Sequence, residues 1–283
     1  MKEVTSNTFL VPNDLPGMWF GVDYHCVLYR GCQLGCVYCT ENKQKSNEKY
    51  DGVSAKINIT EVLPKELARS PGAMIGFGSM TESYPAEEKE LNLTEKALEI
   101  ILKSNNSIHI TTKSDVILRD ISLLTEINKK SFSGVAVSIM CDDELSKILE
   151  PGVPSSSRRF DVIRQLSSAG IYTGVLLMPI LPLVTDTTIN LKYIAKRAAE
   201  AGAKFVIPYF GVDLSSQIRE YYLNFLNKYY YGYDSLYNEM YVNTDFCQIP
   251  RYEFFKEMFI DICNDLNLEY NMLKLKHFKY KEK

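Results

Sequence analysis

The stretch Arg30 to Thr40, RGCQLGCVYCT, carries three cysteines within eight residues, at Cys32, Cys36 and Cys39. A disulfide uses two thiols, and a closed tetrahedral metal site uses four ligands. Soft thiolate ligands select zinc, copper(I) or iron–sulfur clusters. Three thiols therefore predict a metal centre that keeps one coordination position open.

The composition of the chain indicates a globular protein with a sizeable core. Its 283 residues suit one large α/β domain or two small ones. Hydrophobic residues make up 46% and charged residues 24%, which is ordinary for such proteins. The formal net charge of −3 lacks the basic excess that is typical of nucleic-acid-binding proteins, so the overall charge gives no support to that class.

The cysteine count and the absence of long apolar runs bear on the cellular setting. No run reaches the roughly 18 apolar residues of a membrane span, and the first residues lack the apolar core of a signal peptide, so no membrane association is expected. Seven cysteines, an odd number with one tight cluster, argue against a secreted disulfide framework. A reducing, cytoplasmic setting is favoured. Cys141, Cys247 and Cys263 are interpreted as small buried apolar residues.

Six short apolar runs alternate with stretches of helical period. The runs are 25–29, 73–77, 107–111, 134–140, 172–178 and 204–210, and helices are expected at 61–69, 92–104, 115–129, 158–169 and 187–201. This alternation predicts a parallel sheet with helical crossovers, either doubly wound or curled into a barrel. In such sheets the active site lies at the carboxyl ends of the strands. The first five runs do become polar or glycine-rich at these ends.

The ends of these helices carry recognisable signals. Asp115 and Ser157 are expected to be N-cap residues. Gly170 and Gly202 are expected just past helix ends, where a left-handed residue is needed.

After about residue 210 the sequence becomes dense in tyrosine. Residues 250–268 predict a closing amphipathic helix, whose expected buried face is Phe254, Phe255, Met258, Phe259 and Ile262. Tyrosines at helical spacing are interpreted as packing residues. A stacking surface for a base or an aromatic substrate is the alternative.

The metal centre has two interpretations. A structural zinc site requires a fourth ligand, usually from a second Cys or Cys/His pair, and the sequence has no such pair. His25 and Cys26 lie on an expected strand, where packing is the simpler explanation, and a redox CxxC would leave Cys32 unexplained. A [4Fe–4S] cluster held by three thiolates would leave one iron open to a small molecule with an amine and a carboxylate. A non-catalytic zinc-binding module stays the alternative of a different class.

The spacing CxxxCxxC, with Tyr38 just before the third cysteine, is similar to the fingerprint of the radical S-adenosylmethionine (radical SAM) superfamily. Further stretches resemble proteins related to spore photoproduct lyase, and they are GSMTESYPAEE, ITTKSDVILRDISLL, VSIMCDDELSKILEPGVPSSSRRFDVIRQLSSAGI and VLLMPILPLVTD. The resemblance covers about residues 27–210. It implies an α/β fold, a partial TIM barrel (β/α)6 over residues 1–210, which a mainly helical, tyrosine-rich extension over residues 211–283 would close.

The resemblance also implies two cofactors, a [4Fe–4S] cluster and S-adenosylmethionine (SAM). Cys32, Cys36 and Cys39 would ligate the cluster. Tyr38 would lie against the adenine of SAM, and the backbone near Met178 would border the same ring.

The remaining implied contacts concern the methionine end of SAM. Ser79 and Thr81 would meet its amine, since hydroxyl oxygens accept from an ammonium without needing to ionise. Lys113 and Ser138 would hold its carboxylate, for which a lysine at a strand end is a suitable point charge. Without the resemblance, these four residues would be interpreted as ordinary loop and strand residues.

Glu150 and Arg159 also match motif positions, with a role near the ribose or the substrate. One departure concerns the hydrogen-atom donor. The lyase proper is thought to use a cysteine in the loop after the second strand, and here Ser79 stands about where it should be. This departure argues against the lyase reaction itself, although the lineage matches.

The implied activity is reductive cleavage of SAM to methionine and a 5′-deoxyadenosyl radical, which abstracts hydrogen from an unidentified substrate. Flavodoxin or ferredoxin would supply the electron. Nucleic-acid repair is the first candidate role, and modification of RNA or of a peptide by the same radical is the alternative.

Overall fold

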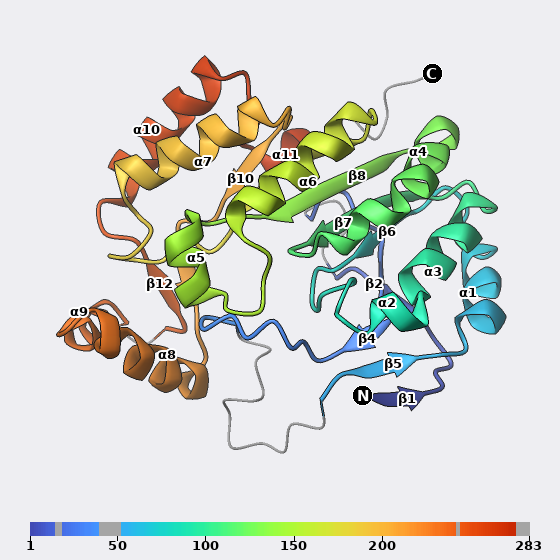
Figure 1. Cartoon of the computed structure of the whole chain (residues 1–283), viewed down its shortest axis with the longest axis horizontal. Coiled ribbons are helices and arrows are strands. Elements are labelled where there is room, and N and C mark those ends of the chain that lie inside the picture. The colour runs from blue at the N-terminus through green and yellow to red at the C-terminus, as the bar shows by residue number, and fades with distance from the viewer. Residues whose placement is uncertain (15–18, 40–51, 242–243, 276–283) are drawn as a thin grey trace.

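The computed structural model describes residues 1–14, 19–39, 52–241 and 244–275 (Figure 1). Its centre is a seven-stranded sheet of order β10-β9-β8-β7-β6-β3-β2. The strands are β2 (Leu10–Pro12), β3 (Tyr24–Cys26), β6 (Met74–Phe77), β7 (Ser107–Thr112), β8 (Ser133–Ser138), β9 (Tyr172–Leu177) and β10 (Val206–Pro208). Neighbours from β3 to β10 pair in parallel, and β2 is antiparallel at one edge. The described strands form an open sheet with six parallel members, as the alternation predicts.

Helices connect these strands and cover one face of the sheet (Figure 1). They are α1 (Ile59–Leu67), α2 (Glu88–Leu91), α3 (Leu93–Leu102), α4 (Ile121–Lys130), α5 (Asp143–Leu149), α6 (Ser156–Ser168) and α7 (Thr188–Glu200). A small second sheet of order β1-β5-β4 joins Lys2–Val4, Ser54–Lys56 and Tyr29–Arg30. None of the described helices combines the length and apolar character that crossing a bilayer requires.

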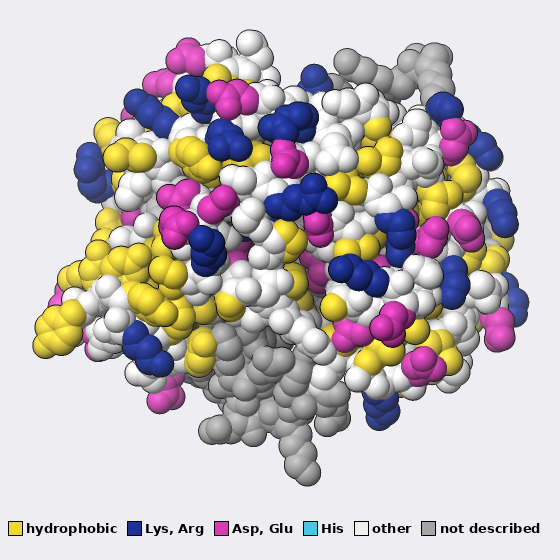
Figure 2. All heavy atoms as spheres, viewed as in Figure 1, with side chains coloured by type: hydrophobic (Ala, Val, Ile, Leu, Met, Phe, Trp, Pro, Cys, Tyr) yellow, Lys and Arg dark blue, Asp and Glu magenta, His cyan; other side chains and the backbone are white. Residues whose placement is uncertain are grey.

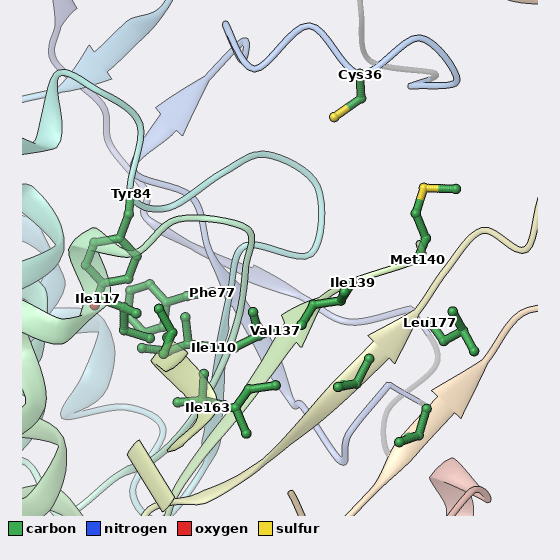
Figure 3. Close-up of a cluster of buried hydrophobic side chains, with 14 of the residues drawn as sticks. Cys36, Phe77, Tyr84, Ile110, Ile117, Val137, Ile139, Met140, Ile163 and Leu177 are labelled. Carbon is green, nitrogen blue, oxygen red and sulfur yellow. The ribbon is translucent and has the colours of Figure 1, made fainter. Parts of the chain in front are cut away.

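The parallel strands are buried on both faces, which is why they read as apolar runs in the sequence. All six residues of β8 are buried. On the helical face, Ile110, Val137 and Ile163 belong to one large core, which Figure 3 follows from Tyr84 toward Cys36. On the opposite face, a smaller cluster gathers around Phe20 and Phe205.

The helix ends confirm some of the expected signals and correct others. Gly170 and Gly202 have φ of +79° and +85°, as residues just past helix ends require. Ser157 is not the N-cap of α6, because the Ser155 hydroxyl accepts the capping hydrogen bond from the Arg158 amide. Asp115 precedes a 3-10 helix, Val116–Asp120, and makes no side-chain capping bond.

The described residues after 210 are mainly helical. It contains α8 (Ser216–Tyr229), α9 (Tyr233–Met240), α10 (Tyr252–Asp265), α11 (Met272–Leu275) and a two-stranded sheet of β11 (Gly211–Asp213) with β12 (Phe246–Gln248). The amphipathic α10 is confirmed, with Phe255, Phe259 and Cys263 buried. The prediction that Phe254 lies on the buried face is wrong, since its side chain is 45% exposed and packs under the Arg251 guanidinium.

The tyrosines of this segment divide into two kinds. Tyr222 and Tyr237 are fully buried, and their hydroxyls lie 3.0 Å apart, so the packing interpretation holds for them. Tyr229 and Tyr231 are exposed, the latter by 97%. Figure 2 shows hydrophobic side chains gathered on the surface over α8 and α9.

Candidate cofactor site

The three clustered cysteines open onto one cavity of about 120 Å³ at the carboxyl end of the sheet. Its wall consists of Cys32, Leu34, Cys36, Cys39, Gly78, Met80, Thr81, Glu82, Thr111, Thr112, Lys113 and Ser138. These residues come from the cysteine loop (residues 31–39) and from the ends of β6, β7 and β8. The structure therefore brings Thr81, Lys113 and Ser138 together with the cysteines. A larger hollow between α1 and α3 has no cysteine on its wall.

The thiols of this loop are reduced and partly shielded from water. Burial raises the pKa of Cys36 to about 12, which outweighs the opposite effect of the Lys113 ammonium, and it also raises the pKa of Cys32. Such thiols keep their protons at neutral pH until a metal displaces them. Across the described residues, no three His, Cys, Asp or Glu side chains are grouped as ligands of a single metal ion.

Behind the cavity lies a buried ionic network centred on Glu150. One Glu150 carboxylate oxygen lies 3.3 Å from the Lys113 ammonium, and the other lies 2.7 Å from the Arg159 guanidinium. Burial alone would raise the pKa of Glu150, but the two cations and their hydrogen bonds lower it to about 2. Glu150 is therefore a carboxylate, and Glu150 and Arg159 stand behind the cavity wall rather than on it.

Tyr38 belongs to the same network. Its hydroxyl donates to Glu150 and accepts from the Lys113 ammonium at 3.1 Å. The ammonium also lies 5.4 Å from the centre of the Tyr38 ring. The ring is buried and is not part of the cavity wall, so its implied adenine contact stays a prediction.

Ser79 and Met178 also lie off the cavity wall. The Ser79 hydroxyl is 2.7 Å from Nδ1 of His25, on the side of the loop that faces β3. Met178 packs against the apolar cluster around Phe20. Their implied contacts with SAM stay predictions. Thr81 is on the wall, and its hydroxyl donates to the Tyr29 carbonyl at 2.9 Å.

Sequence reasoning missed Glu82, which lines the cavity with its carboxylate held in place. This group accepts from the Thr112 hydroxyl at 2.6 Å and from the backbone amides of Lys113 and Tyr84, each at 2.9 Å. The glutamate that follows the small residues of GSMTES was the sequence feature that could have indicated this cavity residue. Glu82 and Lys113 give the wall one anionic and one cationic side chain.

Gly78 allows the loop after β6 to approach β7 closely. Its φ is +77°, and a Cβ there would lie 1.8 Å from the Thr111 carbonyl oxygen. Only glycine meets both conditions, since it lacks the Cβ and tolerates positive φ.

Residues 26–191 match the model of the radical SAM superfamily, and this match covers more than half of the chain. The chain belongs to the radical SAM superfamily. The partial-barrel type of sheet and the cofactors implied by the resemblance are thereby confirmed: this superfamily uses a [4Fe–4S] cluster and SAM. Radical SAM chemistry also needs a reductant.

Relatives of this radical SAM chain have been found in bacteria, archaea and phages. An uncharacterized protein of Mycobacterium tuberculosis is 30% identical over 223 residues, which are 75% of this chain and 65% of that protein. An uncharacterized protein of Methanocaldococcus jannaschii is 29% identical over 62% of this chain and 65% of its own length. The radical SAM Nα-GlyT isomerase of Pseudomonas phage M6 is 25% identical over 62% of this chain and 36% of its own length. The chain thus spans 65% of the length of the first of these relatives.

Solved structures confirm the fold. Spore photoproduct lyase complexed with dinucleoside spore photoproduct superposes with a TM-score of 0.71 at 13% identity, over 95% of this chain and 81% of that one. A doubly substituted mutant of that lyase with bound AdoMet and dinucleoside spore photoproduct gives a TM-score of 0.65 over 88% of this chain and 76% of that one, also at 13% identity. The lyase-like architecture of the radical SAM chain is therefore established at the level of fold.

Proposed function

We propose that this chain is a radical SAM enzyme whose Cys32, Cys36 and Cys39 ligate the [4Fe–4S] cluster. The cofactors, once bound, supply reductive cleavage of SAM to methionine and a 5′-deoxyadenosyl radical that takes hydrogen from a substrate. The observation that carries the proposal is the single cavity wall on which three reduced thiols meet the ends of three parallel strands. The donor set fits the cluster, because soft thiolates are its usual ligands.

The chain's own residues would hold and orient SAM by its charged end. Lys113 and Ser138 bind the methionine carboxylate, and Glu82 with Thr81 binds the ammonium. All four lie on the cavity wall. Opposite charges on one wall suit a zwitterionic amino-acid group, because each charge of the ligand finds a partner in a partly desolvated site. As the resemblance implies, Tyr38 and the backbone near Met178 would border the adenine, and Ser79 would meet the amine.

We propose a nucleic-acid component as the substrate and flavodoxin or ferredoxin as the electron donor, in a reducing, cytoplasmic compartment. The likeness to the fold of spore photoproduct lyase supports the substrate class. Of the extension expected over residues 211–283, the described residues 211–241 and 244–275 would close the barrel, and the others lie outside the described residues. Support for this comes from the pairing of Glu269 beside Phe205 at the edge of β10.

Anaerobic reconstitution tests the enzyme class directly. We expect about four iron and four sulfide per chain, a brown chromophore, and 5′-deoxyadenosine on reduction in the presence of SAM. Colourless protein that holds one zinc would overturn the proposal in favour of a binding module.

The lyase reaction has a separate test. Reduced enzyme incubated with spore-photoproduct dinucleotide is expected to form 5′-deoxyadenosine without releasing thymine, because the loop Gly78–Glu82 offers Ser79 and no cysteine. Thymine release would show that the lyase reaction itself is retained.

Replacement of Lys113 by methionine is expected to weaken SAM binding. A hydrogen bond to a charged group contributes about 1.5–3 kcal/mol, so the dissociation constant should rise about tenfold or more. Equilibrium dialysis of the reconstituted variant measures this change, while its iron content should stay near that of the wild type. Lys147→Met on α5 is the matched control, because its side chain is 67% exposed and its ammonium pairs with the exposed Glu144. Equal affinity in the Lys113 variant would remove this lysine from the site.

A further inference from the structure

The cysteine loop packs against one particular turn, residues 149–152, which joins α5 to α6. The Val37 amide donates to the Leu149 carbonyl at 3.0 Å, and the Gly152 amide donates to the Leu34 carbonyl at 2.9 Å. The two bonds run in opposite directions between the same two segments. They therefore hold the loop on both sides of Cys36.

The approach of the two backbones depends on Gly152. A Cβ at this position would lie 2.7 Å from the Leu34 carbonyl oxygen and 3.0 Å from the Leu34 Cα. The backbone of Gly152 itself is not in the left-handed region, so an alanine would be strained only by this contact. The glycine is required by the neighbouring loop rather than by its own conformation.

The Glu150 side chain in the middle of this turn extends the contact. One of its oxygens accepts a hydrogen bond from the Tyr38 hydroxyl of the cysteine loop and forms an ion pair with Lys113 of the cavity wall. Its other oxygen accepts a hydrogen bond from the Arg159 guanidinium, which also donates to the Ser138 carbonyl at 2.6 Å. One carboxylate thus links the loop, the ends of β7 and β8, and α6.

The charges of this network do not cancel. One carboxylate, Glu150, stands between two cations, Lys113 and Arg159. Arg159 is fully buried, whereas the Lys113 side chain is 17% exposed and lines the cavity. Lys113 therefore presents its positive charge at the cavity wall, which it shares with the Glu82 carboxylate, and an anionic group of a ligand would pair with it there.

We propose that the 149–152 turn is the fixed support of the cysteine loop and that Glu150 is a positioning residue, which aims Lys113 at the SAM carboxylate and holds Tyr38 next to Cys39. The loop and its cation are then in place before either cofactor arrives. Glu150 acts through its neighbours and touches no reacting atom. This inference rests on the proposed function only for the identity of the ligand.

Hydrogen exchange in the cofactor-free protein tests the support. The Val37 and Gly152 amides are expected to be protected in the wild type. Gly152→Ala should expose both amides to exchange while leaving the Ile110 amide of β7 protected, because the added Cβ displaces Leu34 without touching the ionic network. Glu144→Gln is the control, since Glu144 is exposed on α5 and lies outside the network. Rapid exchange of both amides in the wild type would overturn the proposal.

SAM affinity of the reconstituted protein tests the positioning role. Glu150→Gln is expected to raise the SAM dissociation constant about tenfold, as loss of a charged hydrogen-bond partner does. The SAM concentration that half-produces the spectral change of the reduced cluster should rise by the same factor. Ser146→Ala, which removes a hydroxyl bonded to Arg159 and Glu150 but not to Lys113, should leave both readouts unchanged. If Glu150→Gln does not fold, Glu150→Asp takes its place, because it keeps the charge and draws the carboxylate back from Lys113 and Tyr38.

The outcomes separate the two proposals. Protected amides in a wild type that takes up no cluster would overturn the proposed function and leave the support of the loop standing. A wild type with normal cluster and SAM response, matched by Glu150→Gln, would overturn the positioning role and leave the function standing.

Discussion

Replacement of Cys36 by alanine is expected to leave the reconstituted protein without a cluster. The wild type should contain about four iron and four sulfide per chain, and the variant close to none, because two thiolates leave two irons of the cube without protein ligands. Formation of 5′-deoxyadenosine from SAM should be lost with it. Iron and sulfide analysis, the spectrum of the cluster and product chromatography measure the three effects.

Cys36 is the sharpest of the three positions to test, since it is buried and its loop is hydrogen-bonded on both sides. Cys263→Ala is the control, because Cys263 is buried in α10 outside the cavity wall. A Cys36 variant that retains the full cluster and its cleavage of SAM would refute the assignment of this thiol as a ligand.

Replacement of His109 by leucine is expected to make the cofactor-free protein much less sensitive to acid. His109 lies on β7, is 2% exposed, and stacks on Phe20 with the ring centres 3.8 Å apart. Neither ring nitrogen has a hydrogen-bond partner in the described part of the chain. Burial lowers the pKa of His109 to about 3, so the folded protein holds this ring neutral.

The sign of the effect follows from the two states. In the unfolded chain the His109 ring is protonated below about pH 6.5. In the folded chain it stays neutral until the pH falls to about 3. Stability is therefore fully present above pH 6.5 and is lost as the pH falls. Between about pH 7 and about pH 4.5 the loss from this one group is about 2–3 kcal/mol.

Urea unfolding of the wild type and of His109→Leu at these two pH values measures the difference. Asp186 contributes a pH dependence of stability of the opposite sign, because burial raises its pKa to about 6. This contribution is equal in both proteins and cancels in the comparison. His25→Gln is the control, since His25 is only half-buried. Burial lowers its pKa, and the nearby Asp14 carboxylate opposes this effect. An unchanged pH dependence in His109→Leu would contradict the burial argument.

The strands could be predicted where burial is uniform and less well where the chain changes sheets. The runs at 73–77, 107–111 and 172–178 match β6, β7 and β9 to within a residue at each end, because both faces of these strands are covered. The run at 25–29 is split instead. Residues 24–26 form β3 of the large sheet, and Tyr29 and Arg30 form β4 of the small one. Local apolar character does not distinguish the two sheets.

The candidate site was predictable in part for a similar reason. Three thiols at this spacing predict a metal centre through ligand chemistry, and the family resemblance was needed to favour a [4Fe–4S] cluster over zinc. The resemblance named Lys113, Ser138 and Thr81, and the fold brings them to the same cavity. Glu82 and Gly152 were missed, since a glutamate or a glycine in a loop gives no sign of what it will face.

The sequence by itself predicted thiolate ligands with one open coordination position and determined the parallel sheet, because thiolate chemistry and apolar periodicity are local properties of the chain. Only the tertiary structure decided which charges act together. Tyr38 meets Glu150 across 112 residues, and Lys113 meets Tyr38 across 75. The partner of a buried charge is set by the packing of distant segments, and its energy depends on that proximity and on the loss of water around it.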